Sequence, residues 1–163
     1  DFDSQIVVKT NAVELARAET APGRWAGDRI AMGTNTDPYQ KAEGRYRLTR
    51  GIVEVLTERR TPFSILTKST LALRDLDVFV EAAAVTGVSV DFSIATLDED
   101  VWRETEPGTP HPRQRLAAVR RLNEAGVPSG FSASLSRVPW ARIPRRMPAC
   151  GPERPGTSVT RPR

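Results

Sequence analysis

The sequence predicts an α/β protein in which a parallel sheet is covered by helices. Short β-branched runs alternate with longer amphipathic runs, and strands are expected to start near residues 5, 29, 63 and 88. One strand–helix unit occupies roughly 25–35 residues, which is the spacing of these starts. Apolar strands between amphipathic helices form such sheets. A partial βα barrel and a doubly wound sheet both fit this periodicity.

The first half of the chain contains two expected strands and two expected helices. Residues 6–9 are expected as the first strand, and residues 12–19 as a helix with Asn11 as its N-cap. The second strand is expected at residues 29–32. Residues 47–59 are expected to form a helix, because apolar side chains recur at helical spacing there. These apolar positions are Leu48, Ile52, Val55 and Leu56.

The second half continues the alternation. Strands are expected at residues 63–67 and 88–94, and helices at 74–86, 98–104 and 112–125. Gly87 and Gly126 suit the ends of two of these helices, and Pro112 suits a first helical turn. The run from Asp75 to Asp77 and the acids from Asp98 are expected as helix-start charges rather than metal ligands.

The expected folded domain is residues 1–129, and residues 130–163 form a Pro- and Arg-rich tail. Six of the 13 prolines lie in residues 139–162. Such a composition buries too little apolar surface to fold, so a disordered tail is one interpretation. The other interpretation is a frameshift. If residues 130–139 use GC-rich codons, a reading frame shifted by one base can encode Val-Leu-x-Val-Pro-Leu-Pro-Gly, which would form a buried strand followed by a turn.

Charge and cysteine content limit the function classes. Residues 130–163 hold seven Arg and one acid, whereas residues 1–129 hold 17 basic and 19 acidic residues, a net charge of −2. The pI near 9.8 therefore belongs to the tail and is weak evidence for nucleic-acid binding. Cys150 is the single cysteine, which fits a reducing compartment such as the cytoplasm. With one cysteine and one histidine, His111, no metal site is expected.

The chain begins with Asp1 and enters an expected strand almost at once, which favours an internal piece of a longer protein. No apolar run approaches the roughly 20 residues of a membrane span, so no membrane partner is expected. Neither the substrate nor the oligomeric state follows from the sequence.

Candidate functional residues follow the expected strands, because function gathers at the carboxyl ends of parallel strands. Residues 33–40 (GTNTDPYQ) place hydroxyl, amide and carboxylate groups directly after the second strand. Gly33 would let a ligand approach the backbone, and Asp37 could accept from an ammonium or from ribose hydroxyls. A plain Asx-type turn is the alternative, but the polar cluster is longer than a turn needs.

Three more candidate residues are expected near the same mouth, which is the edge of the sheet formed by the carboxyl ends of the strands. Lys68 follows the third strand, and Ser93 shares one face of the fourth strand with Asp91. Arg115 lies just beyond a rigid Pro-Gly turn, where it could meet Glu106 or a ligand carboxylate. A solvated lysine, a hydrogen-bonded core serine and a surface salt bridge are the corresponding structural alternatives.

Taken together, four segments resemble radical S-adenosylmethionine proteins, in the DNA repair photolyase-like branch related to spore photoproduct lyase. The segments are residues 2–11, 33–40, 64–68, and 106–109 together with 115–116. The resemblance covers about residues 1–129 and implies a partial (β/α)₆ barrel. It also implies a [4Fe-4S] cluster that cleaves S-adenosylmethionine to a 5′-deoxyadenosyl radical, lyase-type chemistry and a possible nucleic-acid substrate.

The resemblance further implies which residues bind the cofactor. The loop residues Thr34, Asn35, Thr36 and Asp37 would lie beside its methionyl end. Lys68, Ser93 and Arg115 would make further contacts.

Two departures from the family pattern matter. The CxxxCxxC loop that holds the cluster is absent, since residues 1–149 contain no cysteine. The chain by itself is therefore expected to be inactive. Spore photoproduct lyases also carry a cysteine hydrogen donor where this chain has Met32, Gly33 and Thr34, so thymine-dimer repair by their route is not expected.

Two rival functions remain open. One is a non-radical βα-barrel enzyme that uses Lys68 and Asp37 in acid–base chemistry. The other is a nucleic-acid-binding module that depends on the Arg-rich tail.

Overall fold

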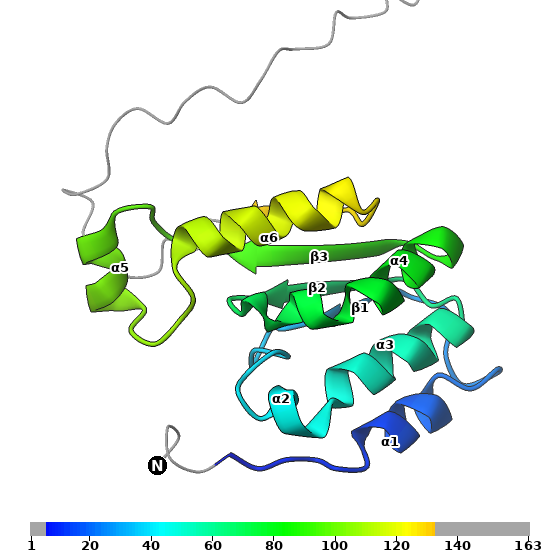
Figure 1. Cartoon of the computed structure of the whole chain (residues 1–163). Helices are drawn as coiled ribbons and strands as arrows, with labels where there is room; N and C mark the ends of the chain where they lie inside the picture. Colours follow the sequence, from blue (N-terminus) through cyan, green and yellow to red (C-terminus); the bar gives the residue numbers. More distant parts are fainter. Residues whose placement is uncertain (1–5, 133–163) are drawn as a thin grey trace, which may run out of the picture.

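The computed structural model describes residues 6–132, which form an α/β domain around a four-stranded parallel sheet (Figure 1). The strands are β1 (Ile30–Met32), β2 (Phe63–Thr67), β3 (Val88–Ser93) and β4 (Phe131–Ser132), and they lie in the sheet in this order. Each strand pairs in parallel with the next along the chain. Over the described residues the order therefore shows no reversal of the kind that defines a doubly wound sheet.

Seven helical segments accompany the sheet within residues 6–132. They are α1 (Ala12–Glu19), α2 (Glu43–Tyr46), α3 (Leu48–Glu58), the 3₁₀ helix η1 (Thr70–Asp75), α4 (Leu76–Val85), α5 (Glu99–Thr105) and α6 (Pro112–Glu124). The predicted elements from residue 12 to residue 125 are confirmed to within one or two residues, apart from the split of the 74–86 segment into η1 and α4 and the extra turn α2. The predicted stop at Gly126 is confirmed, since its φ is +84° and Val127 N–H donates to the Leu122 carbonyl.

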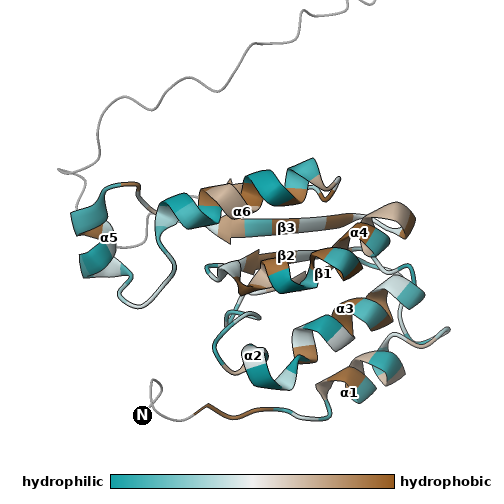
Figure 2. Cartoon of the chain, viewed as in Figure 1, coloured by the Kyte–Doolittle hydropathy of each residue, from teal (hydrophilic) through white to brown (hydrophobic). Residues whose placement is uncertain are grey.

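The helices cover one face of the sheet. Figure 1 shows α3, α4 and α6 on the same side, and the alternate strand residues Phe63, Ile65, Val90 and Phe92 are completely buried in the core beneath them. Figure 2 shows hydrophobic residues along β2 and β3 and in stripes on α1, α3 and α4. On the opposite face the register pairs Ser64 with Ser89 and Leu66 with Asp91, and all four are half-buried. The sheet thus has one core face and one open face.

At the amino-terminal end the predicted strand is wrong, and Asn11 holds the predicted N-cap position without a capping hydrogen bond. Residues 6–9 pair with no strand, and Val7 is 96% exposed. The run has β propensity, but propensity without a hydrogen-bonding neighbour does not make a strand. Asn11 makes no capping hydrogen bond, because its φ of −91° and ψ of 16° depart from the extended geometry of an N-cap.

The sheet extends beyond the expected boundary at residue 129. The carbonyls of Pro128, Gly130 and Ser132 accept the N–H groups of Val90, Phe92 and Ile94 at 3.0 Å each. A fourth strand therefore begins within the described residues, where the sequence analysis expected the tail. The predicted disordered or frameshifted segment from residue 133 onward lies outside them.

Within residues 6–132, no helix combines the length and the apolar character that a membrane crossing requires.

Candidate functional site

The loop after β1 passes directly against the backbone of β2. Gly33 opens this loop with a φ of +97°, and a Cβ atom at this position would lie 2.0 Å from the Leu66 carbonyl oxygen. A glycine is therefore required for both the backbone conformation and the close approach. This contact places the loop at the carboxyl ends of β1 and β2.

Asp37 fastens the loop to the end of β2. Its Oδ1 accepts hydrogen bonds from Tyr39 N–H at 2.8 Å and from the Thr67 hydroxyl at 2.6 Å. Its Oδ2 accepts from Lys68 N–H at 2.8 Å. Both oxygens of the carboxylate accept hydrogen bonds from the loop and from β2, so the geometry gives Asp37 a positioning role, and its predicted contact with a cofactor stays a prediction.

The residues between Gly33 and Asp37 present their side chains outward. Thr34, Asn35 and Thr36 are exposed, and they make no side-chain hydrogen bond with any residue in the described part of the chain. Two hydroxyls and one amide are thus available on a short loop that is fixed at both ends.

A carboxylate links the other three predicted residues. Glu106 accepts from Lys68 Nζ at 2.8 Å through Oε1 and from Arg115 Nη1 at 2.7 Å through Oε2. The same Arg115 nitrogen donates to the Ser93 carbonyl at 2.7 Å. Lys68, Ser93 and Arg115 therefore lie together at the carboxyl end of the sheet, where the sequence analysis expected them.

The two cations of this cluster differ in access. Arg115 is completely buried, and its other donors bind the Pro110 carbonyl and the Thr109 hydroxyl. The Lys68 side chain is 43% exposed. A ligand at the mouth would therefore meet Lys68, while Arg115 holds Glu106 in place from behind.

The pair of cations lowers the pKa of Glu106. Burial works to raise this pKa, but the hydrogen bonds and charges of Lys68 and Arg115 outweigh burial, so the pKa lies below its ordinary value. A carboxylate whose pKa is lowered by folding stabilises the fold at pH values above its unfolded-state pKa. This contribution to the unfolding free energy is lost as the pH falls through the folded-state pKa.

Replacing Glu106 with glutamine is therefore expected to destabilise the protein at neutral pH and to matter less in acid. The difference in unfolding free energy between wild type and Glu106→Gln should shrink as the pH falls below about 4.3. Urea unfolding from about pH 7 to about pH 3 measures this difference. Glu124→Gln, at a 62% exposed position paired with Arg120, serves as control and should change little. A difference for Glu106→Gln that stays constant with pH would contradict the ionised cluster.

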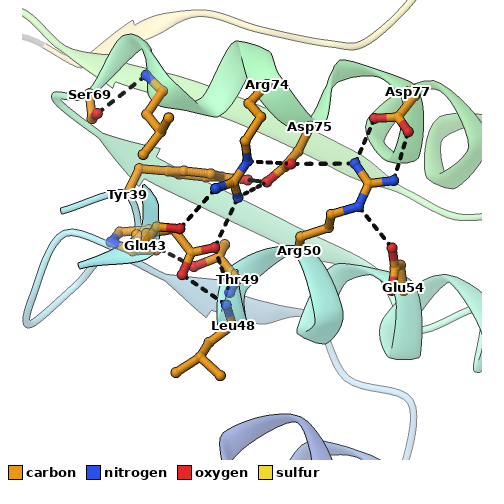
Figure 3. A network of polar contacts seen from close by, with 12 residues as sticks. Tyr39, Glu43, Leu48, Thr49, Arg50, Glu54, Ser69, Arg74, Asp75 and Asp77 are labelled. Atoms are coloured by element: carbon orange, nitrogen blue, oxygen red, sulfur yellow. Dashed lines mark hydrogen bonds and ion pairs between the residues drawn. The ribbon is translucent and has the colours of Figure 1, made fainter. Parts of the chain in front are cut away.

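A second polar network lies behind the loop (Figure 3). The Tyr39 hydroxyl donates to Asp75 Oδ2 at 3.0 Å, and Arg74 donates to both oxygens of Asp75 at 2.8 and 2.7 Å. Asp75 is completely buried, and Tyr39 is 1% exposed. Burial and the neighbouring Asp75 carboxylate raise the pKa of Tyr39, so the phenol stays protonated and donates.

The network continues to α3. Glu43 accepts from Leu48 N–H at 2.9 Å and from Thr49 N–H at 3.1 Å, so its carboxylate caps the start of this helix. Arg74 donates to Glu43 at 3.0 Å and joins the two halves of the network. The loop is thus anchored on α3 as well as on β2.

The outer arm of the network is exposed. Arg50 donates to Asp77 at 2.9 and 2.7 Å, and this hydrogen bond is the main cause that lowers the pKa of Asp77 to about 2. The expectation that Asp75 and Asp77 are merely helix-start charges missed these partners. The expectation for Asp98 is confirmed, since its side chain caps α5 by accepting from Asp100 and Val101 N–H.

Residues 6–132 offer no ligand set for an iron–sulfur cluster. They contain no cysteine, and nowhere among them do three His, Cys, Asp or Glu side chains gather at metal-binding distances. His111 instead caps α6, where its Nδ1 accepts from Arg113 N–H at 3.1 Å.

Comparison with known proteins finds relatives of uncharacterized function. The chain is 49% identical over 127 residues to uncharacterized protein Rv2578c of Mycobacterium tuberculosis, a match that covers 78% of this chain and 37% of that protein. It is 32% identical over 126 residues to uncharacterized protein MJ0683 of Methanocaldococcus jannaschii, covering 77% and 45%. The chain thus spans less than half the length of these relatives. No protein-family profile and no solved structure matches it.

Proposed function

We propose that the chain is part of a radical S-adenosylmethionine enzyme and forms the side of the barrel that binds the cofactor. The observation that carries the proposal is the loop of residues 33–37, with three exposed polar side chains between two fixed ends. The sequential parallel sheet, with its helices on one face, supports a partial barrel of that family. The resemblance in residues 2–11, 33–40, 64–68, and 106–109 together with 115–116 supports the same assignment.

The chemistry of the loop fits the amino-acid end of S-adenosylmethionine. Hydroxyl and amide groups of Thr34, Asn35 and Thr36 can donate to a carboxylate and accept from an ammonium. The Lys68 ammonium adds a positive charge next to this loop, held by Glu106 at 2.8 Å. In the proposal Asp37 orients the loop, and Arg115 fixes Glu106 and the Ser93 carbonyl.

S-adenosylmethionine supplies the radical chemistry in this family when it is bound at an iron–sulfur cluster. The described residues do not fit such a cluster, so its ligands must come from outside residues 6–132 of the complete enzyme. The part assigned to these residues is to bind and orient the cofactor.

The rival acid–base enzyme has less support. A general base needs an available lone pair within reach of the substrate proton. Both Asp37 oxygens already accept hydrogen bonds, and the Lys68 ammonium is paired with Glu106. The Arg-rich segment on which the nucleic-acid-binding alternative depends lies outside the described residues.

Asn35→Ala is expected to weaken S-adenosylmethionine binding about fivefold to tenfold, the loss of one or two hydrogen bonds. Isothermal titration calorimetry on the 163-residue chain measures the affinity. Asn11→Ala is a matched control, because Asn11 is also exposed and makes no capping bond. It should leave the affinity unchanged. Failure of the chain to bind S-adenosylmethionine, or equal losses in both variants, would contradict the proposed site.

A further inference from the structure

The turn α2 and its flanking residues form a positively charged surface, called here the α2 surface, on the side of the domain toward which the strands point (Figure 1). Lys41, Arg45 and Arg47 are exposed there, and none of them forms an ion pair with any residue between 6 and 132. The one acid within residues 40–47, Glu43, is 5% exposed and is paired with Arg74. The outer side of this stretch therefore carries three positive charges and no exposed negative charge.

The backbone at Arg47 supports a role for its charge. Its φ is +51°, in the left-handed region, where α2 ends and α3 begins. Glycine and asparagine adopt this conformation more readily than arginine does, and residues held in such conformations cluster at functional sites. An exposed arginine at a position where asparagine would fit with less strain indicates that the positive charge itself is used.

An apolar hollow of about 320 Å³ adjoins the α2 surface. Tyr46 lines it and is 41% exposed, and Ile6 and Val7 line it and are 50% and 96% exposed. The hollow is on the helix-covered side of the sheet, since its lining also includes Met32 and Ile52, which pack against the core. It is therefore distinct from the open face of the sheet.

Positive charges border this hollow. Lys9 lines it, is exposed, and has no ion-pair partner in the described part of the chain. The Arg45 guanidinium lies over the Tyr46 ring, 5.4 Å from its centroid. Tyrosine and arginine are enriched among the residues that dominate the binding energy of protein interfaces. Lys9 and the α2 surface thus place four unpaired cations of the described chain next to exposed apolar side chains.

We propose that the α2 surface and the adjoining hollow bind an acidic segment of a partner protein. The segment places an aliphatic side chain in the hollow and carboxylates beside the four cations. This interaction is additional to the proposed binding of S-adenosylmethionine and does not depend on it.

A nucleic acid fits this surface less well than an acidic protein segment. Bases stack on open aromatic rings, and one face of the exposed ring of Tyr46 is already covered by Arg45. The hollow is otherwise lined mainly by aliphatic side chains, which suit an aliphatic partner. Residues 1–129 carry a net charge of −2, so a long polyanion would be repelled beyond the α2 surface, whereas a short acidic segment meets only the local cations.

The test uses three acetylated and amidated peptides: Glu-Glu-Leu-Leu-Glu-Glu, its uncharged form Gln-Gln-Leu-Leu-Gln-Gln, and its polar form Glu-Glu-Ser-Ser-Glu-Glu. Amide chemical shifts of the ¹⁵N-labelled 163-residue chain report binding of each. The first peptide should bind with the largest shifts at Val7, Arg45 and Tyr46, and the other two should bind at least about fivefold more weakly. No shifts at about 1 mM of the first peptide, or shifts on other elements only, would overturn the proposal.

Two double variants remove the same charge from different surfaces. Arg45→Gln with Arg47→Asn removes two cations of the α2 surface, and asparagine keeps the left-handed backbone at position 47. Arg113→Gln with Arg121→Gln removes two exposed arginines of α6 that have no ion-pair partner among residues 6–132. The first should weaken binding of the acidic leucine peptide about tenfold, and the second should leave it within about twofold of wild type. Equal losses would show that net charge alone attracts the peptide and would overturn the proposal.

Two further measurements address other occupants. Pentathymidylate has four phosphodiesters, which match the four carboxylates of the peptide, and it should bind at least about fivefold more weakly than the acidic leucine peptide. Binding as tight as that of the peptide, lost in the α2 variant, would assign the surface to single-stranded nucleic acid instead. Sedimentation velocity tests a second copy of the chain: self-association that the α2 variant abolishes would make the surface an interface between copies and overturn the proposal.

Discussion

Gly33→Ala is expected to destabilise the protein by about 3 kcal/mol or more. The new Cβ would lie 2.0 Å from the Leu66 carbonyl oxygen, so β1 and β2 would have to separate at their carboxyl ends. The φ of +97° adds backbone strain for any residue with a side chain. Urea unfolding of the variant and of wild type measures the difference.

Substitutions at two other glycines separate the steric clash from the backbone strain as causes of the destabilisation. Gly108 has a φ of +79° with no atom within 4 Å of an added Cβ, so Gly108→Ala should cost about 1 kcal/mol from the backbone alone. Gly44 lies in α2 with equally open space and no positive φ, so Gly44→Ala should stabilise by about 0.5–1 kcal/mol. A cost for Gly33→Ala no larger than that for Gly108→Ala would mean that the loop does not approach β2 as described.

Asp75→Asn is expected to cost about 2–3 kcal/mol of unfolding free energy. Loss of one partner from a fully buried ion pair costs about 3–5 kcal/mol, and here Arg74 keeps Glu43 as a second partner. Asparagine has nearly the shape of aspartate, but it removes the charge that Arg74 and Arg50 face. Thermal or urea unfolding at neutral pH gives the value.

Asp77→Asn provides the matched control. Asp77 binds Arg50 as Asp75 does, but its side chain is 64% exposed, so the substitution should cost less than about 1 kcal/mol. Tyr39→Phe removes one hydrogen bond to Asp75 and should cost about 1 kcal/mol. Equal costs for Asp75→Asn and Asp77→Asn would show that burial does not separate the two carboxylates in solution.

The elements that depend on local pattern were predictable. Residues 63–67 are confirmed as a strand with both bounds, because its β-branched and aromatic residues lie between clear helical periods. The gathering of Lys68, Ser93 and Arg115 at one edge also followed, because Lys68 and Ser93 lie at the carboxyl ends of neighbouring parallel strands and Arg115 lies shortly after a turn at the same edge. Their predicted role as cofactor contacts stays a prediction.

The features that depend on tertiary contacts were not predictable. Asp75 and Asp77 stand two residues apart on either side of Leu76, yet the first side chain is completely buried and the second is 64% exposed. No local pattern distinguishes them, because burial is decided by the approach of Tyr39 and Arg74. For the same reason residues 6–9 were assigned to a strand, although the neighbouring backbone that would pair with them is absent from the described fold.

The sequential order of the strands also has a consequence for how the protein is made. Each described strand after the first pairs with the strand that leaves the ribosome just before it, so every pairing closes a loop of two helical segments and their turns. Short loops cost less entropy to close, and chains with local pairings fold faster. The sheet can therefore grow strand by strand during translation, without waiting for a distant segment to arrive.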